Sequence, residues 1–443
     1  MKRIACMAAL LVVTLPTQAL SANIGVDSTM ILRFEERAVT GHAKQQLLPA
    51  TQFLAIDSAG LADGNLSMHL AGWARVDLAD KSYSNDSVDG SLTYGYLRYR
   101  FTRANADIRA GRLFVREGII NEQLDGANAR TDLPFGFFLS AFGGAPVHTK
   151  DLYGESSDGK GNSIFGGRLA YRYKGLLELG ASGVYEGSAP TLTSHTNSSH
   201  RLVGGDIWLT PFRYIELIGH SSYNPETKEI AEHSYLLNLK PFNHLVITGE
   251  FNEYRVLSYL GATWSRFPGV ALAPDEKTRV IGGSASYEIS PAIGVSADYK
   301  HYKRDIGTAD RFGGDIRLNF LNKTLHGGVG YHYLQAGDGF GIGYRSDGIT
   351  KKSGSYNELR AYAMHNDKSH FAAIDAIAYI FKEKIDGEGS AWETKASLGY
   401  YLTPALAISG DISYGRNPEL LDELKGLIRL TYNTTFDTKG GKK

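Results

Sequence analysis

The chain has 443 residues, 47 of them basic and 47 acidic, and a single cysteine, Cys6. Balanced charge excludes the basic surface that nucleic-acid binding needs, and one cysteine excludes an internal disulfide and the cysteine clusters of zinc and c-type haem sites. We therefore expect no nucleic-acid partner, no cofactor and no metal site.

The first segment, residues 1–22, has the pattern of a secretory signal: two basic residues, a short apolar run and small residues at its end. Its apolar run is too short to cross a bilayer as a helix. Its removal would take away Cys6, Lys2 and Arg3, leaving 45 basic and 47 acidic residues, a formal charge of −2. We predict that residues 1–22 are cleaved and that residues 23–443 form one domain.

Beyond this segment the dominant pattern is alternation of apolar and polar residues. Successive side chains of a strand point to opposite faces, so such segments predict strands with one apolar face. The pattern predicts about 20 strands, within a range of 18 to 22. Alternation lapses in residues 45–58 and 117–132. The clearest strands are residues 66–78, 281–289, 293–299, 311–320 and 392–402.

Alternation alone does not say whether the apolar face points inward, as in a soluble barrel, or outward to lipid. Aromatic residues near the ends of the apolar faces favour lipid, because membrane barrels carry aromatic girdles at both interfaces. The chain also joins its strands alternately by short turns and by longer polar stretches, which is typical of periplasmic turns and extracellular loops. The aromatic residues in question are Phe312, Phe320, Trp392, Tyr400, Tyr287, Tyr299 and Tyr414.

The last alternating segment, residues 428–436, ends in Phe436. It resembles the terminal assembly signal of bacterial outer-membrane barrels, although a polar tail, residues 437–443, follows the aromatic residue. We predict an all-β fold: a transmembrane antiparallel up-and-down β-barrel in the bacterial outer membrane, with short periplasmic turns and long extracellular loops.

Charged residues gather between residues 94 and 132. Acidic and basic groups that face each other across a pore select solutes by charge, so we predict that this region forms a pore constriction. The alternative is that these charges only line a wet lumen and pair locally. The basic candidates are Arg98, Arg100, Arg109 and Arg112, and the acidic ones are Glu117, Glu122 and Asp125, with Arg130 and Asp132 close behind.

Over its mature length the chain resembles bacterial outer-membrane porins. This resemblance implies passage of small polar solutes or ions, with membrane lipid and, in an oligomer, further copies of the chain as partners. Residues 67–78, 109–114 and 125–132 also resemble barrels of porin-cytochrome conduits in metal-reducing bacteria. That second resemblance implies an insulating sheath around multihaem c-type cytochromes.

An enzyme is the third hypothesis, and the sequence offers no catalytic residues for it. No Gly-x-Ser-x-Gly elbow occurs, and no phosphate-binding loop follows the glycine-rich residues 337–343. Histidines such as His69, His233, His332 and His365 are not spaced like metal ligands. We expect a non-enzymatic protein.

Overall fold

The computed structural model describes twelve ranges of the chain. The predicted signal, residues 1–22, lies outside them, as do residues 438–443 of the tail and the glycine-rich stretch from residue 338 onward. In the described part, no helix is long and apolar enough to cross a membrane. The described ranges are 23–39, 45–61, 64–79, 88–147, 163–189, 198–255, 277–305, 307–320, 324–337, 354–385, 387–418 and 420–437.

Strands make up nearly all of the described chain, with one 3₁₀ turn, η2 (Pro134–Gly136). The strands are β1 (Asn23–Val39), β2 (Gln45–Leu47), β3 (Pro49–Leu61), β4 (Leu66–Asp77), β5 (Val88–Phe101), β6 (Ala106–Glu117), β7 (Ile120–Asp132), β8 (Phe137–Pro146), β9 (Ile164–Tyr173), β10 (Leu177–Ala189), β11 (Ser198–Phe212), β12 (Ile215–Asn224), β13 (Glu229–Phe242), β14 (Leu245–Arg255), β15 (Lys277–Ser290), β16 (Ile293–Arg304), β17 (Gly307–Phe320), β18 (Leu325–Ala336), β19 (Tyr356–Asn366), β20 (His370–Ile385), β21 (Glu388–Thr403), β22 (Leu406–Arg416) and β23 (Leu420–Asp437).

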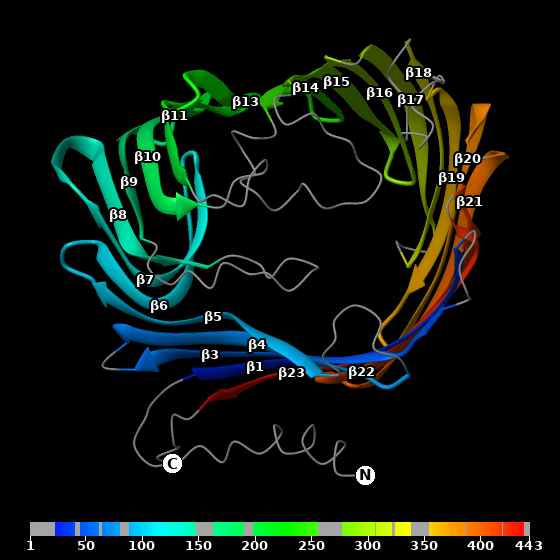
Figure 1. Cartoon of the computed structure of the whole chain (residues 1–443), viewed down its shortest axis with the longest axis horizontal. Coiled ribbons are helices and arrows are strands. Elements are labelled where there is room, and N and C mark those ends of the chain that lie inside the picture. Colours follow the sequence, from blue (N-terminus) through cyan, green and yellow to red (C-terminus); the bar gives the residue numbers. More distant parts are fainter. Residues whose placement is uncertain are drawn as a thin grey trace.

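These strands form one antiparallel sheet that closes into a barrel (Figure 1). The closure joins the two ends of the chain, because β1 pairs with both β23 and β3: Met30 lies opposite Leu430 on one side and Gln52 on the other. The sheet has 23 strands, but β2 has only three residues and pairs with β1 alone, so the ring itself has 22. The predicted barrel is confirmed, with a strand number at the top of the expected range.

Two regions without clear alternation are also strands: β3 covers most of residues 45–58, and β7 covers most of residues 117–132. The connections from β11 to β12, β13 to β14, β15 to β16 and β21 to β22 have two residues each, and all lie at one end of the barrel. Two-residue connections also occur at the opposite end, from β16 to β17 and from β20 to β21, but the long connections from β8 to β9, β14 to β15 and β18 to β19 all lie there. We assign the end without long connections to the periplasm, since outer-membrane barrels have their short turns there.

The apolar faces of the strands point away from the interior. Leu398, on the outer face of β21, is 67% exposed, and Ile412, on the same face of β22, is 56% exposed. Exposed aliphatic side chains continue around the whole ring. An apolar surface of this size is expected where lipid hydrocarbon, and not water, surrounds the protein. The aromatic residues predicted for the interface girdles are all exposed as well: Phe312, Phe320, Trp392, Tyr400, Tyr287, Tyr299 and Tyr414.

The inner face is polar, and many of its charges are paired. On β14 to β19, Lys300 contacts Glu250 at 2.6 Å, and Arg311 contacts Asp298 at 3.0 Å. Arg360 contacts Asp375 on β20 at 3.1 Å. Such pairs let water-filled space exist inside the barrel without unbalanced charge.

Candidate functional site: an inward hairpin and an arginine pocket

The hairpin formed by β6 and β7 leaves the wall of the barrel. β5 pairs with β6 only as far as Arg112, and β8 pairs with β7 only as far as Leu124. Beyond these points β6 and β7 form strand pairs only with each other among the described residues, up to their turn at Gly118 and Ile119. Figure 1 shows this hairpin inside the ring, next to β10. We call residues 112–125 the inward hairpin.

Glycines allow the sheet to bend where the inward hairpin begins. Gly111, Gly126 and Gly144 lie opposite one another on β6, β7 and β8. Gly111 has a φ of 130°, which L side chains rarely adopt, and a Cβ there would collide with the carbonyl oxygen of Gly95. A Cβ on Gly126 would collide with the carbonyl oxygen of Gly143. The close backbone approach at this crease therefore requires glycine.

The inward hairpin packs on the inner wall through an apolar face. Leu124 is fully buried, and its neighbours on the hairpin point to the same side because they follow the alternation of the two strands. Burial of this apolar surface stabilises the inward position. This packing also explains why the alternation of apolar and polar residues is weak in residues 117–132. In the hairpin part of this segment, the apolar side chains contact the inner wall and not lipid. The cluster consists of Leu113, Val115, Ile120 and Leu124 from the hairpin and Phe142, Ile164, Val184, Leu202 and Ala231 from the wall.

Hydrogen bonds hold the tip of the hairpin against β8 and β10. The backbone N–H of Ile119 donates to Ser182 Oγ at 3.2 Å, and Ser140 Oγ donates to Glu117 Oε2 at 2.8 Å. Ser140 and Ser182 are both buried, so these bonds satisfy polar groups that the hairpin shields from water. Glu117, predicted as an acidic pore residue, thus anchors the tip to the wall.

The opposite face of the inward hairpin carries Arg112 and Asp125. Arg112 Nε and Nη2 donate to the two oxygens of Asp125 at 2.8 and 2.7 Å, and Nη1 donates to the carbonyl oxygen of Leu92 at 3.1 Å. Gln123 donates to the carbonyl oxygen of Thr93 at 2.5 Å. Because the other face packs on the wall, this one is turned toward the remaining interior, and its bonds tie the hairpin to β5.

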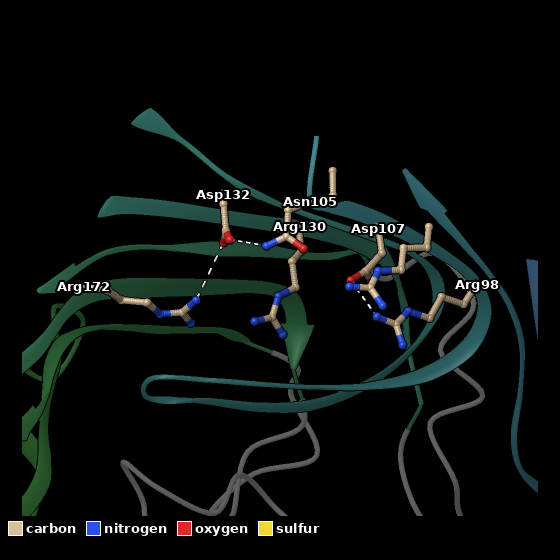
Figure 2. A pocket seen from close by; sticks show the side chains of 8 residues that line it. Arg98, Asn105, Asp107, Arg130, Asp132 and Arg172 are labelled. Carbon is tan, nitrogen blue, oxygen red and sulfur yellow. Dashed lines mark hydrogen bonds and ion pairs between the residues drawn. The ribbon is translucent and has the colours of Figure 1, made fainter. Parts of the chain in front are cut away.

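A second feature, a pocket of about 250 Å³, lies at the base of the same strands near the periplasmic turns (Figure 2). We call it the arginine pocket. Arg98 Nη2 contacts Asp107 Oδ2 at 3.1 Å, and Asp132 accepts a hydrogen bond from Asn105 and contacts Arg172 Nη1 at 3.7 Å. Its lining consists of Arg98, Arg100, Asn105, Ala106, Asp107, Arg130, Asp132 and Arg172.

Phe138 forms the support of this pocket. Its ring is 1% exposed and lies under two guanidinium groups, 4.7 Å from that of Arg130 and 4.6 Å from that of Arg172. Guanidinium groups are attracted to aromatic faces. Behind them Arg168, also buried, contacts Asp206 at 2.5 Å and Glu178 at 2.6 Å. Phe138 and these pairs hold the basic side chains in a fixed arrangement.

The arginine pocket has an excess of positive charge. Four arginines and two aspartates line it. Within the described ranges, Arg100 and Arg130 form no ion pair with an acidic side chain. Their guanidinium donors therefore remain available to a solute. Guanidinium groups bind carboxylate and phosphate oxygens through paired hydrogen bonds.

The structure distributes the predicted constriction residues over two places. Arg98 and Arg100 line the arginine pocket, and Arg109 joins Arg98 on Asp107, at 3.2 Å. Arg112, Glu117, Glu122 and Asp125 belong to the inward hairpin, where Arg112 and Asp125 meet. The ion pairs described among these residues are local: Arg112 with Asp125 and Arg98 with Asp107 across neighbouring strands, and Arg109 with Asp107 along β6.

Sequence reasoning missed Asp107, Phe138, Arg168 and Arg172 as members of this region. Arg168 and Arg172 stand on the polar face of β9, where the sequence shows only two ordinary wall charges. Their proximity to β6 and β7 arises from the fold. A search for basic residues four apart on one strand face would have selected them without indicating their partners.

Comparisons with known proteins agree with this architecture at the level of fold. No protein-family model matches the chain, and no curated protein matches it. Among solved structures, a mutant of the ferric enterobactin receptor PfeA from Pseudomonas aeruginosa superposes with a TM-score of 0.55 at 9% identity, covering 92% of this chain and 80% of that one. The shared fold is that of a bacterial outer-membrane barrel.

Other solved structures that resemble the chain include OccAB4 from Acinetobacter baumannii, with a TM-score of 0.46, 11% identity and coverage of 95% and 100% of the two chains. The outer membrane protein OpdK from P. aeruginosa has a TM-score of 0.45, 9% identity and coverage of 93% and 99%. With its closed ring, lipid-suited outer face and polar interior, the protein is a transmembrane β-barrel of the bacterial outer membrane.

Proposed function

We propose that the protein is a porin-type channel for small polar solutes or ions, with preference for anions at the arginine pocket. The observation that carries this proposal is a polar barrel interior in which a packed hairpin projects from the wall toward the lumen. A ring of 22 strands is wider than its own side chains can fill, so an element that narrows the passage is needed for selectivity. The inward hairpin supplies such an element.

In this proposal the predicted site residues act at two levels. Arg112 and Asp125 keep the inward hairpin in place and present a neutral pair to the passage. Arg98 and Arg109 neutralise Asp107, while Arg100 and Arg130 attract an anion toward the periplasmic end. Positive charge in a confined passage favours anions because the low dielectric of the wall weakens screening.

The test is single-channel recording of the mature protein in planar bilayers, with reversal potentials measured in a salt gradient. We expect steady conductance with mild anion preference, and a shift toward cations in the double variant R100A/R130A. The matched control is R317A/R360A, which removes two arginines from the interior faces of β17 and β19. Absence of conductance from a folded, heat-modifiable barrel would contradict the channel. If the protein conducts but R100A/R130A leaves the reversal potential unchanged, the channel stands and only the role of the arginine pocket is contradicted.

No observation on the described part of the chain supports the cytochrome-sheath hypothesis. The number of chains in the working assembly is a separate question from channel function. A porin-like oligomer would be detected by cross-linking in intact outer membranes. No partner beyond lipid and solute is proposed.

A further inference from the structure

Two histidines meet at the periplasmic turn between β19 and β20. His365 lies at the end of β19 and His370 at the start of β20, and their ring centroids are 5.4 Å apart. Asp367 lies between them in the turn. One residue lies between His365 and Asp367, and two lie between Asp367 and His370. The side chains converge because the chain turns here, and the sequence analysis, which expected scattered histidines, did not predict this convergence.

The turn fixes the carboxylate of Asp367 in one orientation. Its Oδ1 accepts hydrogen bonds from the backbone N–H groups of Ser369 and His370 at 2.7 and 2.9 Å, and from Ser369 Oγ at 2.9 Å. With these bonds Oδ1 is fully engaged within the turn. Oδ2 is left to face the histidines.

The three side chains place ligand atoms at distances that suit a metal ion. Asp367 Oδ2 lies 3.1 Å from His370 Nδ1 and 3.6 Å from His365 Nε2, and all three ligand atoms lie within 4.8 Å of one another. In a tetrahedral site with bonds of about 2.0–2.1 Å, two donors are about 3.3 Å apart. The two Asp367 distances lie on either side of this value.

The charge of this group differs from that of the other histidine cluster in the described chain. Asp298, Asp315 and His332 also converge in the barrel interior, but Arg311 contacts Asp298 at 3.0 Å and supplies a cation there. Around Asp367, no described lysine or arginine forms an ion pair with the carboxylate. Its side chain and those of His365 and His370 are 33%, 35% and 47% exposed, so solvent can reach them.

We propose that His365, Asp367 and His370 bind one divalent transition-metal ion of the zinc class at the periplasmic rim of the barrel. Two imidazoles and one carboxylate select Zn²⁺, Ni²⁺ or Cu²⁺ over Mg²⁺ and Ca²⁺, which prefer oxygen ligands. The fourth position is open to water or to a periplasmic ligand. Since His365 lies on β19 and His370 on β20, a bound ion would also cross-link these two strands.

The test uses the untagged mature protein in detergent, stripped of metal and titrated with ZnCl₂ and CuCl₂. We expect one equivalent to bind by calorimetry, and the Cu²⁺ electron paramagnetic resonance spectrum to show nitrogen ligands. H365A/H370A should weaken binding by at least about tenfold and remove the nitrogen signature. The control is H244A, at the β13–β14 turn, where the only acidic partner of the histidine among the described residues is Glu288 at 3.8 Å.

Heat-modifiability on electrophoresis shows whether each variant is folded, so a loss of binding can be separated from a loss of structure. D367N provides a second variant, because it keeps the shape of the ligand and removes its charge. No binding to the folded protein, or equal binding in H365A/H370A, would overturn the site. A lack of conductance would leave this inference untouched, since it does not depend on the channel.

Discussion

Arg112 and Asp125 lie directly opposite each other on β6 and β7 and are joined by two parallel hydrogen bonds of 2.8 and 2.7 Å. A fork of this kind fixes both side chains more tightly than a single contact does. Because Arg112 also donates to the carbonyl oxygen of Leu92, the pair links the inward hairpin to β5.

We predict that R112A loosens the inward hairpin without unfolding the barrel. The pair is partly exposed, so its loss should lower the free energy of unfolding by about 1 kcal/mol or less. Single-channel recordings should show noisier and larger currents. R112K keeps the charge but loses the fork and should give an intermediate result. R360A, which breaks the Arg360–Asp375 pair in the opposite wall, is the control and should leave the current noise unchanged.

The crease at the base of the hairpin provides a second prediction. G126A places a methyl group against the carbonyl oxygen of Gly143 and the Cα of Gly144. The strands must separate there, so we expect lower refolding yield and a destabilisation of about 1–3 kcal/mol. A methyl group added at Gly249 on β14 would have no atom within 4 Å, so G249A is the matched control. Equal denaturant midpoints for the two variants would show that the crease tolerates a side chain.

A third prediction concerns the apolar contact of the hairpin with the wall. L124A removes a fully buried side chain, which should cost about 2–5 kcal/mol locally and release the hairpin. Hydrogen exchange of amides in residues 113–123 should become faster while the wall strands remain protected. L398A changes a lipid-facing leucine that is 67% exposed and should leave hairpin exchange as it is. Unchanged exchange in L124A would mean that the hairpin is held by its polar contacts.

The Asp367 turn gives a prediction that depends on pH. Hydrogen bonds from His370 and Ser369 lower the pKa of Asp367 in the folded protein below its ordinary value of 3.8. A lowered folded pKa means that the stabilisation is present above 3.8 and is lost as the pH falls through the folded value. Wild type should therefore exceed D367N in thermal stability at neutral pH, and the difference should vanish in strong acid. Metal-free protein must be used.

A non-titrating turn serves as the control for this measurement. Thr403 Oγ1 accepts hydrogen bonds from the backbone N–H groups of Ala405 and Leu406 at 3.2 and 3.0 Å, as Asp367 does in its own turn. The stability difference between wild type and T403V should be independent of pH in the same range. A D367N difference that also stays constant into strong acid would contradict the ionised cap.

The candidate site was predictable only in part. The clustering of Arg98, Arg100, Arg109 and Arg112 before Glu117, Glu122 and Asp125 is visible in the sequence, and so is the lapse of alternation after Glu117. The ion-pair partners of these residues are not visible in the sequence. Asp107 lies nine positions after Arg98, on the adjoining strand, and Arg168 and Arg172 come from a strand further around the wall. Which side chains form ion pairs depends on the register of neighbouring strands, and the alternation of apolar and polar residues does not determine that register.

The sequence by itself determined the strand content, the polar interior, the lipid-suited exterior and the upper limit of the strand number. The strand content follows because a strand exposes its two faces in strict turn. The outward direction of the apolar faces follows from the aromatic residues near their ends and from the alternation of short and long connections. Only the tertiary structure decided that β6 and β7 bend at Gly111 and Gly126 and pack inside the barrel. The inward position depends on contacts between Leu124 and wall residues that are distant in the sequence. A local sequence pattern cannot predict such contacts.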